Sequence, residues 1–575
     1  MSKSGPTVTT FSSLIGFALR RLSARVLAGV RVLLWQRPVS VIPARVMFAP
    51  EALVDPDPAV AADIYAGVFA LAGVVVDASA RSPFMIDAPS PDWARALHSF
   101  GWLHHLDAQA DRLSSSNARA LFDEWLAAPS ANGDIANEPD VMADRLYAWL
   151  VQSPLLLIGA DPAFRQRYMR ALGRHMRRLE RALALLPKGM TRLRVAATLA
   201  IAGTVIADEG RLARKAMGAL ADAVSDEILP DGGHASRSPE ALLTILAVLI
   251  PLREALTRRQ LPTPDFLRET IDRVFPMLRF FRYGDGGLAT FHGTGIVSPA
   301  LMEAALDYDD VQGHPAPNAR YSGYQRLAAG GTVVLFDTGR APPPSHAQRA
   351  HASTLAFEFA HGATRLVVNC GALERARPDW IAAARASAAQ STLVIAERSS
   401  AKVLERWPLV GYLGPVLYRG PRRVDVTREG LTARADHDGY HDAFGLLHER
   451  TLALSDDGLW LDGTDRLIGP DRLDGYPFVV RFHLGPNVKA RLEPKRNRVL
   501  MTLPDSAIWL FGLDEGPGLA LEDSIVLVGP RQVRRTTQIV VAGNSLTDDT
   551  VRWHIARHAA PLDIEAESAE DIEPE

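Results

Sequence analysis

The spacing of apolar residues changes at about residue 315, and this change constrains the fold more than any other feature of the chain. Before it, apolar side chains recur every three or four residues, as in amphipathic helices. After it, they recur at every second residue, as in strands with one buried face. The linker-like stretch His314-Pro-Ala-Pro317-Asn-Ala-Arg320 lies at the boundary. We therefore predict a helical domain over residues 55–314 and a strand domain over residues 315–560.

The first of these domains contains a long series of predicted helices, several of which begin at or just after Ser, Asp or Pro. Their ranges are 58–69, 93–109, 118–127, 139–156, 162–186, 191–207, 210–228, 239–259 and 264–281. Short connections between consecutive helices favour antiparallel pairs that curve into a toroid or a solenoid.

The second domain contains short strands separated by Gly, Pro, Asp and Asn turns, which indicates an antiparallel β-sandwich. We expect strands at 332–336, 354–359, 365–370, 392–396, 452–461, 478–484, 499–503, 508–513, 524–528, 538–542 and 551–557. The fold class is therefore multidomain: an incomplete (α/α) toroid followed by an antiparallel β-sandwich.

Charge and cysteine content exclude several classes of protein. Residues 563–575 hold seven acids and no base, so removing them from the formal charge of −3 leaves +4 on the rest of the chain. We expect residues 561–575 to form an acidic disordered tail. Basic residues are spread out rather than clustered, so nucleic-acid binding has no support. Cys370 is the only cysteine, which excludes an intrachain disulfide.

Residues 1–54 form a separate N-terminal basic segment. Between residues 11 and 35 the sequence is apolar but interrupted by Arg20, Arg21, Arg25 and Arg31, an order that does not fit a secretory signal. Two alternatives stay open. The segment is either an amphipathic helix in peripheral contact with an anionic membrane, or a first helix packed on the toroid with its arginines in solvent.

Three short β-like segments between residues 349 and 392 each carry a polar residue at a comparable position. The segments are Arg349-Ala-His351-Ala-Ser353, Arg365-Leu-Val-Val-Asn369-Cys-Gly and Ala388-Ala-Gln390-Ser-Thr392. In this order, and following a helical domain, they resemble the heparinase II/III family of polysaccharide lyases. Asp231-Gly-Gly-His234, Gly284-Asp285-Gly-Gly and Ser322-Gly-Tyr324 add to the resemblance.

The resemblance implies cleavage of uronic-acid-containing, anionic polysaccharides by β-elimination, which needs a neutralised carboxylate, a base and an acid. It also implies a zinc ion in the sandwich, held at the positions of His351, Asn369 and Gln390. Asn and Gln are poor zinc ligands. We therefore expect a degenerate metal site and no cofactor, with zinc as the metal that this site would take.

Five residues are the candidate catalytic groups: His234, Arg237, Tyr283, Arg349 and His351. His234 and Arg237 lie in a Gly-Gly loop that we expect to approach the ligand closely. Tyr283 lies close to the position at which the family has its catalytic tyrosine, and the neighbouring Arg282 would lower the pKa of Tyr283. Arg349 replaces a histidine, so it would grip a carboxylate without acting as a base. His292 and His346 are reserve candidates.

We predict a carbon–oxygen lyase with weakened activity, and we keep two rivals. One is a catalytically silent glycan-binding or cell-envelope protein of the same fold. The other is a glycoside hydrolase, for which Asp231 and Asp285 are the loop acids. The family indicates the envelope or periplasm, whereas the N-terminus also allows a cytoplasmic or membrane-peripheral location.

Overall fold

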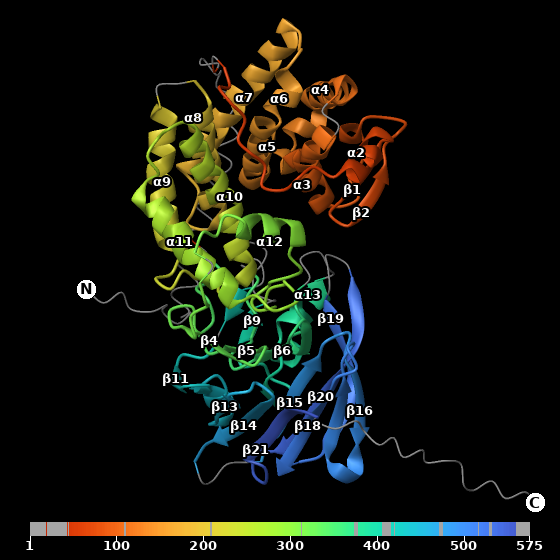
Figure 1. The fold of residues 1–575 in the computed structure, drawn as a ribbon, viewed down its shortest axis with the longest axis vertical. Coiled ribbons are helices and arrows are strands. Elements are labelled where there is room, and N and C mark those ends of the chain that lie inside the picture. Colours follow the sequence, from red (N-terminus) through yellow and green to blue (C-terminus); the bar gives the residue numbers. More distant parts are fainter. Residues whose placement is uncertain are drawn as a thin grey trace, which may run out of the picture.

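The computed structural model describes residues 45–108, 111–207, 210–311, 313–372, 378–404, 416–418, 420–470, 475–515, 517–527 and 532–558, with Leu19 and Pro43. The predicted acidic tail lies outside the described residues. Of the predicted N-terminal segment, only Leu19, Pro43 and residues 45–54 are described. The helical domain lies at one end of the molecule and the two large sheets lie at the other (Figure 1). No helix among the described residues is long and apolar enough to cross a membrane.

Helices α2 to α12 form the N-terminal half as a series of neighbours. Their bounds are α2 Pro58–Tyr65, α3 Pro91–Ser99, α4 Arg112–Ala127, α5 Pro139–Val151, α6 Ser153–Leu157, α7 Pro162–Leu183, α8 Met190–Val205, α9 Arg211–Glu227, α10 Pro239–Arg258, α11 Asp265–Phe280 and α12 Pro299–Leu306. Asp57, Ser90, Asp111, Asp161 and Ser298 cap helices by accepting backbone N–H groups. Contacts of α8 with α5, α9 and α10 form the centre of this half, as expected for an incomplete toroid.

Several of the predicted helices are wrong in their limits. The helix expected at 118–127 begins at Arg112, and the one expected at 139–156 is divided at Gln152 into α5 and α6. The helix expected at 58–69 ends at Tyr65, because Gly67 adopts a left-handed φ of 79° and the chain turns into a hairpin of β1 (Val68–Leu71) and β2 (Val74–Asp77). Its β-branched valines favour a strand. The helix expected at 93–109 breaks at Phe100, where φ is 61°, and continues as the 3₁₀ helix η2 (Gly101–Ala108).

Two antiparallel sheets form the C-terminal half of the described chain. The first has the order β19-β20-β15-β7-β6-β5-β4-β3, with β8 paired to β15, and the second has the order β11-β12-β13-β14-β21-β18-β17-β16. The bounds in the first sheet are β3 Asn318–Ala319, β4 Tyr324–Ala329, β5 Thr332–Asp337, β6 Phe357–His361, β7 Thr364–Val368, β8 Leu393–Ile395, β15 Pro477–Leu484, β19 Leu519–Leu527 and β20 Val533–Asn544. Those in the second are β11 Val424–Glu429, β12 Thr432–His437, β13 Leu447–Leu454, β14 Trp460–Ile468, β16 Lys489–Glu493, β17 Arg498–Thr502, β18 Ile508–Glu515 and β21 Thr550–Arg557.

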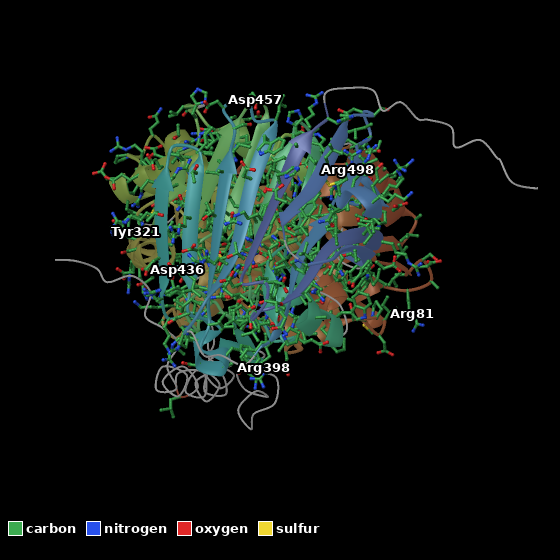
Figure 2. The ribbon with its side chains drawn as sticks, turned by 90° about the horizontal axis from the view of Figure 1, so that it is seen from below. Arg81, Tyr321, Arg398, Asp436, Asp457 and Arg498 are labelled. Atoms are coloured by element: carbon green, nitrogen blue, oxygen red, sulfur yellow. The ribbon has the colours of Figure 1, made fainter. Side chains whose placement is uncertain are left out.

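Smaller elements complete the described chain. A separate two-stranded sheet pairs β9 (Lys402–Leu404) with β10 (Val416–Tyr418), and α13 (Pro378–Arg385) and α15 (His441–Phe444) are short helices. Viewed from below, Asp457 and Arg398 lie at opposite ends of the sandwich (Figure 2). The first of them belongs to a turn that the strand pattern failed to predict. The single strand expected at 452–461 is wrong: β13 ends at Leu454 and β14 begins at Trp460, because Gly458 turns the chain with φ 71°.

Each half has its own apolar core. The helical core includes Trp93, Trp149 and Phe122, and the sandwich core includes Trp509 and Trp553. The helical core continues through Phe291 and Tyr324 into the first strands of the sandwich. The two halves therefore meet through packed side chains, and the loops at this junction are held in fixed positions.

Candidate functional site

Three loops meet at the junction of the two halves and carry most of the predicted site residues. They are the α9–α10 loop (228–238), the chain after α11 (281–298) and the β5–β6 loop (338–356). The β-like segment expected around Arg349 and His351 is a loop, because β5 ends at Asp337 and β6 begins only at Phe357. Asn369 and Gln390 likewise lie beside strands, one after β7 and one before β8.

The Gly-Gly pair of the α9–α10 loop is packed against protein. A Cβ atom on Gly233 would lie 1.8 Å from Ser322 Oγ, and one on Gly232 would lie 2.0 Å from the Arg273 carbonyl oxygen. Asp231 accepts hydrogen bonds from Ser322 N at 2.7 Å and Ser322 Oγ at 2.8 Å. The expectation that these glycines admit a ligand is therefore wrong, because their close approach is to the neighbouring backbone and to Ser322. Asp231 ties the loop to the sandwich.

Arg237 is fully engaged in this loop. Its Nε donates to the Ser322 carbonyl at 2.7 Å, and its two terminal nitrogens bond the carbonyls of Arg340 and Gly323, His292 Nε2 and Asp337 Oδ1. These contacts use the five N–H donors that a guanidinium has. The Arg237 side chain therefore acts as a clamp between the two halves of the molecule, with no donor left for a substrate carboxylate.

Asp337 is the anionic partner of that clamp. It is buried, and its Oδ2 accepts a hydrogen bond from Ser353 Oγ at 2.7 Å and lies 3.2 Å from His292 Nε2. Burial works against the charged form, but Arg237 and His292 outweigh it and lower the pKa of Asp337 to about 2. The carboxylate is therefore held charged.

Tyr283 belongs to a second buried group, centred on Glu358. The Tyr283 hydroxyl donates to Glu358 Oε2 at 3.1 Å, and Glu358 Oε1 accepts from Thr290 N and Asn369 Nδ2, each at 3.1 Å. Arg365, and not Arg282, lies over the Tyr283 ring, at 4.7 Å from its centroid. Burial and the Glu358 carboxylate raise the pKa of Tyr283 well above its ordinary value. The expectation of a lowered pKa is wrong.

Arg349 and His351 differ in exposure although they are two residues apart. The Arg349 side chain is 50 % exposed and its guanidinium lies 3.2 Å from Glu240 Oε2. His351 is buried, and its Nε2 accepts the Gly293 N–H at 3.1 Å. Burial and the neighbouring His292 lower the pKa of His351 well below its ordinary value. Arg349 thus faces solvent, whereas His351 is a neutral side chain of the interior.

The donor set His351, Asn369 and Gln390 does not fit zinc. Asn369 Oδ1 accepts the Ser391 N–H at 2.9 Å, and its amide nitrogen is bound to Glu358. Gln390 Nε2 donates to the Ala384 carbonyl at 2.9 Å. Gln390 Oε1 and His351 Nδ1 make no hydrogen bond of good geometry among the described residues. Gln390 nevertheless opposes part of the lowering of the His351 pKa. The Asn369 amide is therefore committed to protein groups, and His351 remains as the single strong ligand.

His234 lies close to Glu227 and His346, a grouping that the sequence did not predict. Its Nε2 lies 3.0 Å from Glu227 Oε2, at the end of α9, and the same oxygen lies 3.3 Å from His346 Nε2. His234 Nδ1 accepts the Ser236 N–H at 3.1 Å and lies 2.7 Å from Ser236 Oγ. Glu227 occurs in an ordinary helical pattern, so only its position in the fold connects it with the two histidines.

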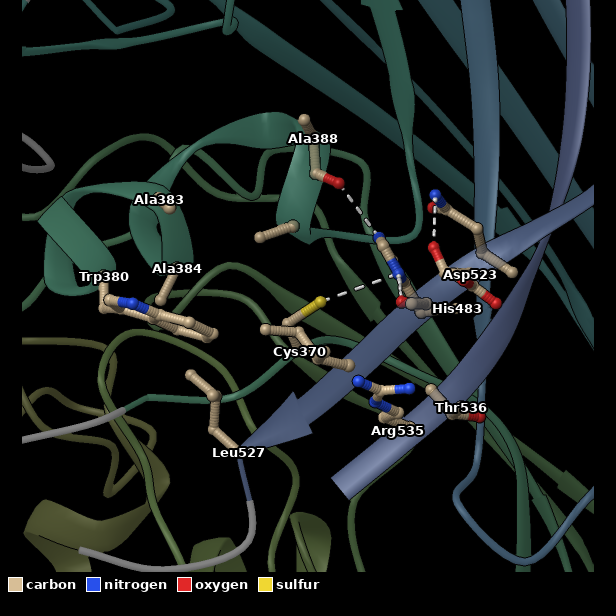
Figure 3. A pocket seen from close by; sticks show the side chains of 14 residues that line it. Cys370, Trp380, Ala383, Ala384, Ala388, His483, Asp523, Leu527, Arg535 and Thr536 are labelled. Atoms are coloured by element: carbon tan, nitrogen blue, oxygen red, sulfur yellow. Dashed lines mark hydrogen bonds between the residues drawn. The ribbon is translucent and has the colours of Figure 1, made fainter. Parts of the chain in front are cut away.

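A separate pocket of about 530 Å³ lies on the sandwich, beside α13 (Figure 3). His483 of β15 projects into it, with Nε2 3.0 Å from the Ala388 carbonyl and Nδ1 2.7 Å from Ser524 Oγ. The Cys370 thiol lies 3.5 Å from the same Nδ1, and burial raises its pKa to about 12. The pocket therefore holds neither a reactive thiolate nor any of the predicted catalytic residues.

The sequence and the two-part fold resemble those of known proteins. A family model described as Heparinase II/III-like, C-terminal, matches residues 311–555. FtsZ-localized protein C of Caulobacter vibrioides (strain NA1000 / CB15N) is 33% identical over 475 residues, which cover 79% of this chain and 80% of that protein. The chain belongs to the heparinase II/III-like family.

Solved structures show the same fold at low sequence identity. Heparinase III superposes with a TM-score of 0.67 and 12% identity, covering 95% of this chain and 92% of that one. Heparan sulfate lyase HepC from Pedobacter heparinus superposes with a TM-score of 0.58 and 15% identity, covering 93% and 88%. The predicted fold class, a helical N-terminal region followed by an antiparallel β-sandwich, is thereby confirmed. This heparinase II/III-like chain thus keeps the architecture of the lyases.

Proposed function

We propose that this chain is a catalytically silent member of the heparinase II/III-like family and that it acts at the bacterial division site in association with FtsZ. The observation that carries the first half is the state of the two candidate proton-transfer groups. Tyr283 is 4% exposed and bonded to Glu358, and His351 is 2% exposed with Nε2 occupied by the Gly293 N–H. A base for β-elimination must reach the substrate proton and have a pKa near the working pH. Neither residue meets these conditions.

The clamp residue Arg237 supports the same half of the proposal. The predicted role of gripping a uronate carboxylate needs free N–H donors, and its five donors bind the Ser322, Gly323 and Arg340 carbonyls, His292 and Asp337. Arg237, Tyr283 and His351, three of the five predicted catalytic residues, thus make hydrogen bonds between the two halves.

Similarity to FtsZ-localized protein C supports the second half. The match covers 79% of this chain and 80% of that protein, so it includes both the helical domain and the sandwich. That protein's name describes where it is found and no lyase activity. The proposal accordingly places this chain at the cell envelope through its association with FtsZ, with peripheral membrane contact by the N-terminal segment as an additional prediction.

The weakened lyase is the second candidate, favoured by the exposed Arg349. Its side chain is 50% exposed at the junction of the halves, where an anionic glycan could bind its guanidinium. His346, three residues earlier and 11% exposed in its side chain, would be the remaining base, although burial lowers its pKa.

Two measurements on the full-length protein separate these candidates. Incubation with heparin, heparan sulfate, alginate and hyaluronan would be followed by the absorbance of the unsaturated uronate product. Binding to purified FtsZ would be measured by biolayer interferometry, with an unrelated protein as the control surface. We expect FtsZ binding and no absorbance change. Uronate product that disappears in Arg349→Ala would establish the lyase instead, and absence of FtsZ binding would reject the division-site role.

A further inference from the structure

Glu227, His234 and His346 converge at the junction, at a place distinct from the degenerate donor set of the sandwich. Glu227 and His234 belong to the helical domain, and His346 belongs to the β5–β6 loop. One ligand atom from each lies within 4.8 Å of the other two. The two histidine rings are 5.3 Å apart between centroids and inclined at 78°. This is the one such group of three His, Cys, Asp or Glu side chains in the described part of the chain.

Two of the three spacings between these ligand atoms match a tetrahedral zinc site, and the third is within 4.8 Å. Zinc–ligand bonds of roughly 2.0–2.1 Å place two tetrahedral ligand atoms about 3.3 Å apart. Glu227 Oε2 lies 3.0 Å from His234 Nε2 and 3.3 Å from His346 Nε2. One glutamate and two histidines form a recognised donor set for zinc, and three protein ligands leave a fourth position open.

Two of the polar atoms that face each other in this group lack a hydrogen-bond partner among the described residues. Glu227 Oε2 and His234 Nε2 are buried, and neither makes a hydrogen bond of acceptable geometry among the described residues, although they are 3.0 Å apart. Their N–H and lone-pair directions therefore do not point at each other. A buried carboxylate needs a cation or hydrogen-bond donors, and no Arg or Lys ion pair with Glu227 occurs in the part of the chain that the structure describes.

The surrounding chain fixes the orientation of the histidines. Ser236 holds His234 through Nδ1, which accepts the Ser236 N–H at 3.1 Å and lies 2.7 Å from Ser236 Oγ, so Nε2 is the ring atom that faces Glu227. Zinc needs the lone pair of Nε2, so on metal binding the ring proton moves from Nε2 to Nδ1 and is donated to Ser236 Oγ, in place of the bond from the Ser236 N–H. Hydrogen bonding of the second ring nitrogen is the usual way in which proteins orient a metal-bound histidine. The His346 backbone N–H donates to the Pro343 carbonyl at 2.8 Å, in a turn that begins inside the run Pro342–Pro344, and the His346 side chain is 11% exposed. His346 therefore gives solvent a route to the group.

We propose that Glu227, His234 and His346 form a zinc site that joins the helical domain to the β-sandwich. The metal accepts one oxygen and two nitrogen ligands from the two halves and keeps one position for water or for an anionic group. This site does not depend on the proposed division-site role or on lyase activity, because it rests only on these three side chains.

The test is zinc titration of the full-length protein by isothermal calorimetry after dialysis against a chelator, with zinc-dependent thermal melting as a second readout. We expect one equivalent of zinc and a higher melting temperature with zinc. Loss of a direct ligand should weaken binding at least about tenfold, the minimum seen for outer contacts of metal sites. His346→Ala removes the most exposed ligand, and Glu227→Gln removes the charge with little change in shape.

Two variants serve as matched controls. His441→Ala removes an exposed histidine from α15, and Gln390→Leu removes the unpartnered amide oxygen of the sandwich donor set. Both should bind zinc as the unchanged protein does. The proposal is overturned if the protein takes up no zinc, if His346→Ala and Glu227→Gln bind it undiminished, or if only Gln390→Leu loses it. Because His346 is at the surface of the junction, its variant keeps the test valid should Glu227→Gln fail to fold.

Discussion

The Tyr283 hydroxyl donates a hydrogen bond to Glu358 Oε2 across 3.1 Å, inside the junction between the helical domain and the sandwich. Tyr283, at the position where the family's catalytic tyrosine is expected, therefore donates to a buried carboxylate. Its pKa is raised by burial and by that carboxylate, which disfavours the phenolate that a base would need.

We expect Tyr283→Phe to reduce stability and to leave binding to FtsZ unchanged. Loss of the hydroxyl removes one donor from Glu358, which costs about 1–3 kcal/mol when a buried acceptor loses its partner. Urea denaturation measures this loss, and Tyr321→Phe, at a 54% exposed tyrosine, is the control with no expected change. A Tyr283→Phe variant of full stability that has lost a measurable lyase activity would contradict the structural role.

Arg237→Ala should be strongly destabilising. It leaves Asp337 as a buried charge without its main partner, and breaking a buried pair in this way costs about 3–5 kcal/mol. Chemical denaturation of the variant measures the loss. Arg422→Ala is a suitable control, because Arg422 pairs with Asp442 at the surface and should contribute nothing measurable. Equal stability of the two variants would show that the clamp does not hold the halves together.

Stability should fall in acid because of Asp337. Its pKa is lowered from 3.8 to about 2 in the folded protein, so its contribution is present above pH 3.8 and is lost as the pH falls towards 2. A difference of this size corresponds to about 2 kcal/mol. Urea denaturation between pH 7 and pH 2 should show this decline, and the decline should be smaller in Asp337→Asn. An unchanged pH profile in that variant would assign the acid sensitivity to other carboxylates.

Gly233→Ala should destabilise the α9–α10 loop. The added Cβ would lie 1.8 Å from Ser322 Oγ, so Ser322 must move and lose its bond to Asp231. Overpacking of this kind costs about 1–3 kcal/mol. Gly218→Ala is the matched control, since Gly218 lies in α9 with no neighbour within 4 Å of the added atom and should gain about 0.5–1 kcal/mol. Thermal melting of the two variants should therefore shift in opposite directions.

Local sequence patterns predicted the division into a helical half and a strand half, but they missed whole strands of the sandwich, among them β4, β11, β12 and β16, and the limits of several other elements. The period change near residue 315 falls between α12, which ends at Leu306, and β3, which begins at Asn318. The β1–β2 hairpin and the β13–β14 turn were missed, because glycines such as Gly67 and Gly458 in left-handed conformations interrupt patterns that otherwise continue. A periodicity averaged over many residues does not respond to one backbone angle.

The candidate site was predicted in part. The sequence pointed to His234 and His346, but it gave no signal for Glu227, Glu240 or Asp337. Glu227 is the partner of the two histidines, Glu240 is the partner of Arg349, and Asp337 is the partner of Arg237. Glu227 and His346 are far apart along the chain and meet only because the β5–β6 loop packs on the end of α9. Such contacts leave no periodic trace in the sequence.

The sequence by itself determined the two-part architecture and the family, because apolar periodicity and short ordered motifs are properties of the chain. The tertiary structure decided whether the chemical groups are free to act. Arg237 can grip a carboxylate in solution, but in the fold its donors bind the Ser322, Gly323 and Arg340 carbonyls, His292 and Asp337. A side chain's chemistry depends on its partners and its exposure to water, and both are set by contacts between residues distant in the sequence.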